Sequence, residues 1–181
     1  MIWASDSQGR TTYVSPEWLV LTGQSRAEAE GLGWLEVTHP ADREIVLAVV
    51  EEANRAAADF TITFRLRRRN GDFVWMVGGA MPSFSPQDGR FLGFLGSISE
   101  APKLAASKAH GRVGHYRPLP PSPLTQPHSV LDLIADHLLM ARALAAEAGE
   151  EMLRSIIDMS LLEAGQRLAR CHRERNSSAL N

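Results

Sequence analysis

The sequence of 181 residues contains one cysteine, two lysines and no long apolar run. The single cysteine, Cys171, excludes an intramolecular disulfide and any zinc or redox centre of the CxxC type. No apolar run approaches the roughly 20 residues that a membrane-spanning helix needs. Asp6 interrupts the N-terminal stretch before the apolar region of a signal peptide could form. These absences predict a cytoplasmic protein without a membrane span.

The chain also has no large excess of positive or negative charge, because 19 basic and 21 acidic residues give a net charge of −2. This balance excludes a polycationic protein that binds nucleic acid through charge alone, and we expect no nucleic-acid partner. One basic cluster lies beside a predicted hairpin, where strand alternation turns two of its members toward solvent. We interpret the cluster as a solvated face, with a surface for an anionic partner as the alternative. Its members are Arg65, Arg67, Arg68 and Arg69.

Composition divides the chain into four parts. Residues 1–100 hold all four tryptophans and both β-hairpin signals. Residues 101–127 hold six of the ten prolines and little apolar periodicity, which predicts a Pro-rich linker. Residues 128–172 have helical periodicity, and we expect residues 173–181 to form a disordered polar tail.

Residues 1–100 combine strand and helix patterns. Short strands are predicted at 2–5 and 11–14 around a turn at Gly9, and Ser15-Pro16 and His39-Pro40 each begin a helix. From Phe60 to Arg67, apolar residues alternate with threonine and arginine, which is typical of a strand with one wet face. Hairpin signals at Asn70-Gly71 and Asp88-Gly89 then separate strands at 72–84 and 91–99. The result is an α+β fold with five antiparallel strands and helices inserted between strands 2 and 3.

This order, with the residues at its corners, resembles a PAS domain of the type common in bacterial sensor kinases and cyclic-di-nucleotide enzymes. PAS domains commonly end their last strand with the motif Asp-Ile-Thr, and at this position the chain has Ser97-Ile98-Ser99. The matching pieces cover about residues 2–100: Asp6-x-x-Gly9, Tyr13-x-Ser15-x-x-Trp18, Leu21-Thr22-Gly23, Gly31-x-Gly33-Trp34, His39-Pro40-x-Asp42, Phe64-Arg65-Leu66-Arg67-Arg68 before Asn70-Gly71, Trp75, Pro82 and Gly93.

A PAS fold would place large apolar side chains between its helices and its sheet. They would either form ordinary core or line a pocket for an unknown small ligand. The resemblance disfavours haem and LOV-type flavin, because the helix expected over residues 42–58 contains neither histidine nor cysteine. We interpret His39 as a helix-start residue and expect neither a metal nor a cofactor. The pocket candidates are Tyr13, Trp18, Trp34, Val46, Val50, Phe64 and Trp75.

Two amphipathic helices are predicted after the linker, with Ala148-Gly149 as the turn between them. A hairpin of this kind cannot bury both apolar stripes alone, so they must pack on the PAS sheet or on a second chain. The stretch 156–165 resembles the second helix of a histidine-kinase dimerisation domain, which implies a homodimer. Its dimer or partner-docking residues would be Leu131, Ile134, Leu138, Leu153, Ile157 and Leu161.

No nucleophile, base and acid occur together at a spacing that indicates an enzyme. The sequence therefore predicts a non-catalytic bacterial signal-transduction protein, a PAS sensor or adaptor that contacts a kinase or a response regulator. The alternative is a degenerate or accessory component of a two-component phosphorelay. In that case His128 or His137 would accept the phosphoryl group, although His128 lacks the usual phosphorylation box around it.

Overall fold

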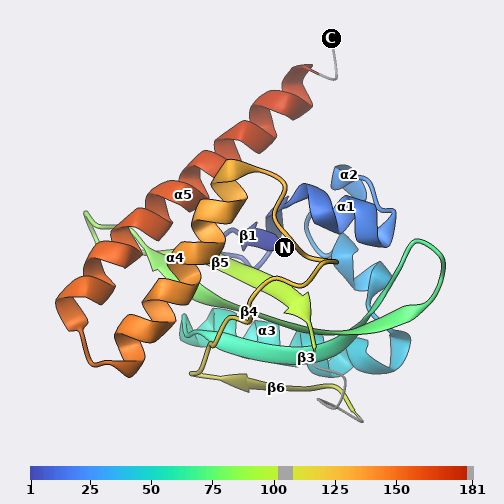
Figure 1. Cartoon of the computed structure of the whole chain (residues 1–181), viewed down its shortest axis with the longest axis horizontal. Helices are drawn as coiled ribbons and strands as arrows, with labels where there is room; N and C mark the ends of the chain where they lie inside the picture. The colour runs from blue at the N-terminus through green and yellow to red at the C-terminus, as the bar shows by residue number, and fades with distance from the viewer. Residues whose placement is uncertain (102–107, 179–181) are drawn as a thin grey trace.

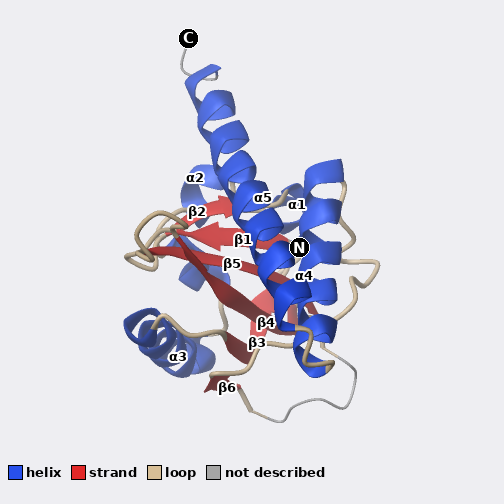
Figure 2. Cartoon of the chain, turned by 90° about the vertical axis from the view of Figure 1, so that its left-hand side faces the viewer, coloured by secondary structure: helices blue, strands red, loops and turns tan. Residues whose placement is uncertain are grey.

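The computed structural model describes residues 1–101 and 108–178, in which six antiparallel strands form one sheet with helices on both faces (Figures 1 and 2). The strand order across the sheet is β2-β1-β5-β4-β3-β6. This arrangement confirms the predicted α+β class. The strands are β1 (Ile2–Ser5), β2 (Thr11–Val14), β3 (Phe60–Arg67), β4 (Phe73–Phe84), β5 (Phe91–Glu100) and β6 (His110–Val113).

The helices between β2 and β3 begin and end at residues suited to those positions. Helix α1 (Pro16–Thr22) starts after Ser15 with proline in its first turn. It ends at Gly23, whose left-handed φ of 78° is easily reached by glycine. Ser25 and Glu28 cap the next helix reciprocally, as a capping box. The remaining elements of this group are α2 (Arg26–Ala29), the 3₁₀ helices η1 (Gly33–Val37) and η2 (Pro40–Asp42), and α3 (Arg43–Ala56).

The sheet has one strand more than the sequence predicts, and the extra strand lies within the segment interpreted as a linker. Strand β6 pairs with the edge of β3, from Phe60 opposite Val113 to Thr63 opposite His110. Its sequence, His-Gly-Arg-Val, has no apolar alternation, so periodicity could not reveal it. Tyr116 and Thr125 are also buried, so residues 108–127 pack against the domain instead of hanging free. Residues 102–107 of the predicted linker lie outside the described part.

The C-terminal helices are α4 (Val130–Glu147) and α5 (Glu151–Ser178), joined by a turn in which Gly149 has a φ of 72°. The turn is where the sequence predicts it. Helix α5 extends to Ser178, whereas the sequence pattern placed a disordered tail from residue 173. No proline or glycine interrupts residues 166–178, so nothing in the chain ends the helix earlier. Residues 179–181 lie outside the described part.

Two apolar cores occupy the two faces of the sheet. The inner face, toward α1–α3, packs side chains such as Trp18, Val46, Phe60 and Phe64. The outer face is covered by α4 and α5, which cross the sheet as a pair (Figure 2). Because strand residues alternate between faces, neighbours such as Phe94 and Leu95 belong to different cores. Of the two predicted supports for the helical hairpin, the structure uses the sheet of the same chain.

Candidate functional site

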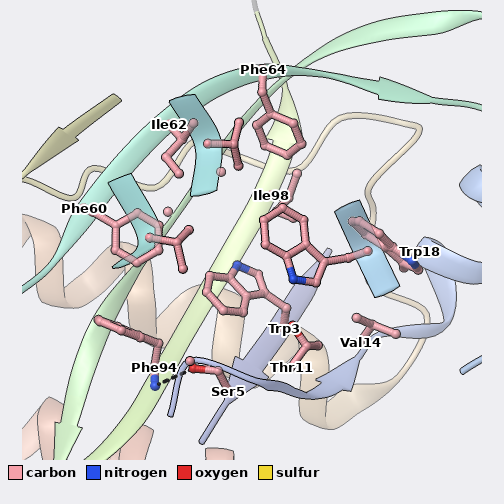
Figure 3. A pocket seen from close by; sticks show the side chains of 16 residues that line it. Trp3, Ser5, Thr11, Val14, Trp18, Phe60, Ile62, Phe64, Phe94 and Ile98 are labelled. Atoms are coloured by element: carbon pink, nitrogen blue, oxygen red, sulfur yellow. Dashed lines mark hydrogen bonds between the residues drawn. The ribbon is translucent and has the colours of Figure 1, made fainter. Parts of the chain in front are cut away.

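A small cavity lies inside the core of the inner face, with a volume of about 60 Å³ (Figure 3). A cavity needs roughly 10–15 Å³ of space for the centre of a water molecule to hold one water, so this cavity admits a few waters or a small molecule. Its lining is formed by β1–β5, α1, η1 and α3. The lining residues are Trp3, Ser5, Gly9, Thr11, Val14, Trp18, Trp34, Val46, Val50, Phe60, Ile62, Phe64, Gly78, Gly79, Phe94 and Ile98.

The chemistry of this cavity is predominantly apolar. Phe60 and Phe94 meet edge to face with ring centres 5.3 Å apart. The Oγ of Ser5 accepts a hydrogen bond of 3.2 Å from the backbone N–H of Phe94 and is therefore already engaged. Trp3 contributes an indole N–H that is buried and has no acceptor among the described residues. The cavity thus suits a small, mainly apolar guest, and it brings together no group for acid–base or nucleophilic chemistry.

Five of the seven pocket candidates line this cavity, namely Trp18, Trp34, Val46, Val50 and Phe64. Tyr13 does not, because its neighbour Val14 faces the cavity, and strand alternation turns Tyr13 to the outer core.

Trp75 is also misplaced by the sequence interpretation. Its neighbours Val74 and Met76 point into the inner core, so Trp75 lies on the other face. There the guanidinium of Arg65 stands 5.2 Å from the centre of the indole ring. Sequence reasoning missed Phe60 and Ile62, although their alternation with Phe64 was the signal for both. That this cavity binds a ligand stays a prediction.

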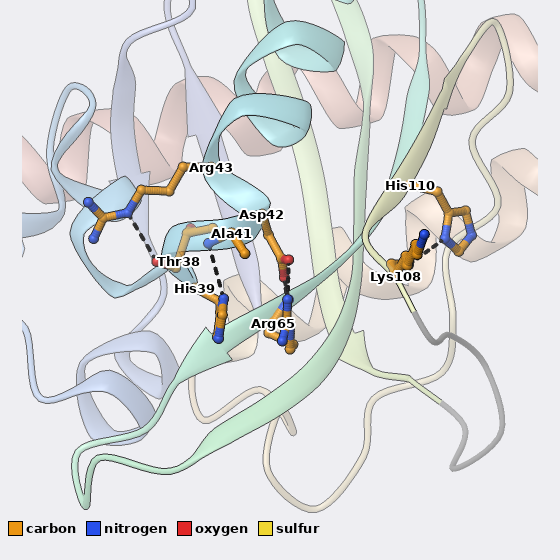
Figure 4. A network of polar contacts seen from close by, with 8 residues as sticks. All are labelled: Thr38, His39, Ala41, Asp42, Arg43, Arg65, Lys108 and His110. Carbon is orange, nitrogen blue, oxygen red and sulfur yellow. Dashed lines mark hydrogen bonds and ion pairs between the residues drawn. The ribbon is translucent and has the colours of Figure 1, made fainter.

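The His-Pro-x-Asp corner is a structural joint between η2 and β3 (Figure 4). The Nδ1 of His39 accepts the backbone N–H of Ala41 at 3.2 Å, as expected of a helix-start residue. The carboxylate of Asp42 accepts hydrogen bonds from the backbone N–H and the guanidinium of Arg65. Burial raises the pKa of the Asp42 carboxyl, but the hydrogen bonds and charge of Arg65 outweigh burial and leave that pKa below its usual value.

A second set of polar contacts joins β2 and α1 to the start of α4. The hydroxyl of Tyr13 donates a hydrogen bond of 2.7 Å to Asp132, which also accepts from the hydroxyl of Ser129. Glu17 on α1 accepts the backbone N–H of His128 at 2.6 Å. Asp136 is buried with one carboxylate oxygen unpartnered among the described residues. This set forms the polar joint of the outer face.

Burial governs the protonation of the groups in the polar joint. Burial raises the pKa of Asp132 and of Asp136 above the usual carboxyl value. The amino group of Met1 donates to the carbonyls of Ile98 and Thr125, and burial lowers its pKa to about 6. Among the described residues, no group of three or more histidine, cysteine, aspartate or glutamate side chains could hold a metal ion.

The six predicted dimer or partner-docking residues lie in two different environments. Ile157 and Leu161 are buried in the outer core, and Leu131 and Leu138 pack partly buried against it. Ile134 and Leu153 are 47% and 49% exposed, on the solvent side of the hairpin.

His128 lies just before α4, with Nδ1 3.6 Å from an oxygen of Glu17 and most of its side chain exposed. Its role as a phosphoacceptor stays a prediction. In the described part of the chain, no helix combines the length and the apolar character needed to cross a membrane.

Comparisons with known proteins found a relative by sequence, similar solved structures and a matching family model. The uncharacterized protein y4lL of Sinorhizobium fredii is 38% identical over 96 residues, which are 53% of this chain and 12% of that protein. The chain therefore spans only a small part of that relative's length.

Among solved structures, the N-terminal domain of a diguanylate cyclase with a PAS/PAC sensor from Marinobacter aquaeolei is 20% identical. The match covers 55% of this chain and 92% of that one, with a TM-score of 0.49. A PAS domain from Colwellia psychrerythraea is 22% identical over 55% of this chain and 84% of that one, with a TM-score of 0.46.

The family model of the PAS fold matches residues 11–98. The match ends before the C-terminal hairpin, so the resemblance of that hairpin to a kinase dimerisation domain stays a prediction. The matched segment contains β2, the inserted helices, β3, β4 and almost all of β5, together with most of the residues that line the inner cavity. Residues 11–98 of this chain therefore form a domain of the PAS family.

Proposed function

We propose that this protein is a non-catalytic signalling module in which the PAS domain presents the α4–α5 hairpin to a second copy of the chain. The resulting homodimer would pass the state of the PAS domain to a kinase or a response regulator. A ligand, where one binds, would be small, because the inner cavity measures about 60 Å³.

The observation that carries this proposal is the apolar surface on the solvent side of the hairpin. Its side chains are between 41% and 79% exposed. Grouped apolar side chains on a protein surface mark interaction sites more often than isolated ones do. We call this set the hairpin surface: Val130, Leu133, Ile134, Leu144, Met152, Leu153, Ile156 and Met159.

A second copy is the partner that this geometry favours. The hairpin already uses its opposite side, including Ile157 and Leu161, to cover the sheet. Two antiparallel helices with a remaining apolar face can bury it against an identical pair, which gives a four-helix arrangement with two-fold symmetry. The apolar residues occur on both helices, so each copy offers the same surface that it would contact.

Native mass spectrometry of the full chain tests this proposal. We expect a dimer at micromolar concentration and a mainly monomeric Ile156→Glu variant, because the glutamate would have to be desolvated at the interface. Leu32→Glu is the matched control, since Leu32 is 52% exposed, close to the 59% of Ile156, but lies in the PAS domain. A monomeric wild type, or equal loss of the dimer in both variants, would refute the proposal. A reproducible extra mass would reveal a ligand in the cavity.

A further inference from the structure

A groove of about 330 Å³ lies on the PAS domain, and it shares no lining residue with the inner cavity or with the hairpin surface. It is formed by α1, the turn between β3 and β4, and the segment that leads into α4. In Figure 1 the β3–β4 turn curves up beside α1. We call it the arginine groove, and its lining residues are Glu17, Val20, Leu21, Arg68, Arg69, Asn70, Pro123, Leu124 and His128.

Hydrogen bonds hold the walls of the arginine groove together. The backbone N–H of Arg69 donates to the carbonyl of Leu21 at 2.8 Å, which ties the β3–β4 turn to α1. The backbone N–H of His128 donates to Glu17 at 2.6 Å, which ties the start of α4 to the same helix. The groove is therefore built before any ligand arrives, and binding would require little ordering of the chain.

Two guanidinium groups lie in the groove, those of Arg68 and Arg69. Among the described residues, neither Arg68 nor Arg69 has an ion-pair partner, whereas Arg65 is paired with Asp42. The Nε–H of Arg68 is buried and has no acceptor in the described part of the chain. Because neither arginine is held in an ion pair within this part of the chain, both can bind an anion that enters the groove.

The carboxylate of Glu17 offsets part of this positive charge: its Oε1 accepts the backbone N–H of His128, and its buried Oε2 has no hydrogen-bond partner among the described residues. The imidazole of His128, 66% exposed, adds a third nitrogen-bearing group beside the two arginines. The planar fork of an arginine matches the two oxygens of a carboxylate or a phosphate.

One side of the groove is apolar. Val20 is 67% exposed although it lies on α1, and Pro123 and Leu124 face the same space. An apolar group carried by an anion would cover Val20 while its oxygens met the arginines. A bare inorganic ion would leave this surface in contact with water.

We propose that the arginine groove binds a small organic oxyanion, a carboxylate or a phosphate monoester attached to an apolar group. Arg68 and Arg69 bind the oxygens, His128 adds a hydrogen bond, and the apolar group rests on Val20 and Leu124. The site is independent of the proposed dimer, because none of its residues belongs to the hairpin surface.

Two-dimensional ¹H–¹⁵N NMR titration of the full chain tests this site. The probes are phenyl phosphate, phenylacetate, inorganic phosphate and uncharged phenol. We expect phenyl phosphate or phenylacetate to shift the amide signals of Val20, Arg69, Leu124 and His128, and phenol to leave them unmoved. Preference for one of the two aromatic anions identifies the oxyanion as phosphate or carboxylate. Inorganic phosphate should bind more weakly than phenyl phosphate, because it leaves the apolar side uncovered.

Glutamine variants separate the site from general electrostatics. The double variant Arg68→Gln/Arg69→Gln keeps the long side chains and should weaken binding by at least tenfold, because a neutral amide binds an oxyanion less strongly than a guanidinium does. Arg67→Gln is the matched control, because Arg67 neighbours the pair but does not line the groove. Thermal unfolding establishes that the variants are folded. Equal weakening in Arg67→Gln, binding of phenol as tight as that of phenyl phosphate, or no shifts at about 10 mM of either aromatic anion would each overturn the proposal.

Discussion

The two faces of the PAS sheet are packed in different ways. The inner core is built from aromatic and branched side chains around a cavity of about 60 Å³. The outer core uses many small residues, with alanines at positions 135, 145 and 164. It also carries the polar joint, in which Tyr13 contacts Asp132 across 119 positions of sequence. The inner core surrounds a small apolar cavity, and the outer face has directional polar contacts.

This difference separates two tasks. Apolar packing is non-directional, so the inner core holds the helices on the sheet and still leaves space for a guest. Buried hydrogen bonds have defined geometry, and leaving one unmade is costly. The polar joint therefore specifies one position of α4 on the domain. We expect damage to the inner face to unfold the domain, and damage to the outer face to release the hairpin.

The largest effect is expected from Phe60→Ala on the inner face. Phe60 is 2% exposed and contacts the rings of Trp3 and Phe94. Removing a buried phenyl ring costs about 3–5 kcal/mol, so the free energy of unfolding should fall by this amount in chemical denaturation. Phe84→Ala is the control, because Phe84 is 45% exposed and should cost less than about 1 kcal/mol. Similar losses in both variants would show that the inner core does not control stability.

A smaller and local effect is expected from Leu161→Ala on the outer face. Leu161 is 1% exposed where α5 covers the sheet, and its truncation should cost about 2–4 kcal/mol. Hydrogen exchange should speed up throughout α4 and α5, while the amides of β3, β4 and β5 keep their protection. Leu153→Ala is the control from the same helix, at a side chain that is half exposed. Loss of protection across the whole sheet would mean that the two faces unfold as one unit.

Much of the inner face could be predicted from the sequence, because local periodicity encodes it. The alternation of Phe60, Ile62 and Phe64 and the Asn70-Gly71 turn predict two strands and the face that each residue occupies. The misplacement of Tyr13 and Trp75 has a simple cause. Both are large aromatic residues that composition assigns to a core, whereas the apolar neighbours Val14 and Val74 decide which face each one occupies.

The outer face could not be predicted to the same extent, because its contacts join distant parts of the chain. Asp132 and Asp136 are typical of a solvated helix face in sequence, yet they lie buried against the domain. Strand β6 has no apolar pattern of its own and exists through its pairing with the edge of β3. The arginine groove likewise combines residues from α1, the β3–β4 turn and the segment before α4, none of which forms a motif alone.

The smallest effect concerns Asp136→Asn and runs in the stabilising direction. Burial raises the pKa of this carboxyl, so the folded protein holds the proton more tightly than the unfolded chain does. The stability linked to this group is therefore complete below the unfolded pKa of about 3.9 and is lost as the pH rises through the higher folded pKa. At pH 7 the wild type keeps a buried carboxylate with one oxygen unpartnered among the described residues.

Asparagine removes that charge and keeps the shape, so we expect the thermal midpoint of Asp136→Asn to rise by about 2–4 °C at pH 7, equivalent to about 1 kcal/mol. At pH 3 to 4 the gain should shrink, because the wild-type carboxyl is then protonated. Opposing this gain, the amino group of Met1 attracts the carboxylate and lowers its pKa, but with a pKa of about 6 this amino group is mostly uncharged at pH 7. Differential scanning calorimetry at both pH values decides between the two effects. A lower midpoint of Asp136→Asn at pH 7 would mean that the surroundings of the carboxylate stabilise it by more than burial costs, and that the outer face is held by charge as well as by hydrogen bonds.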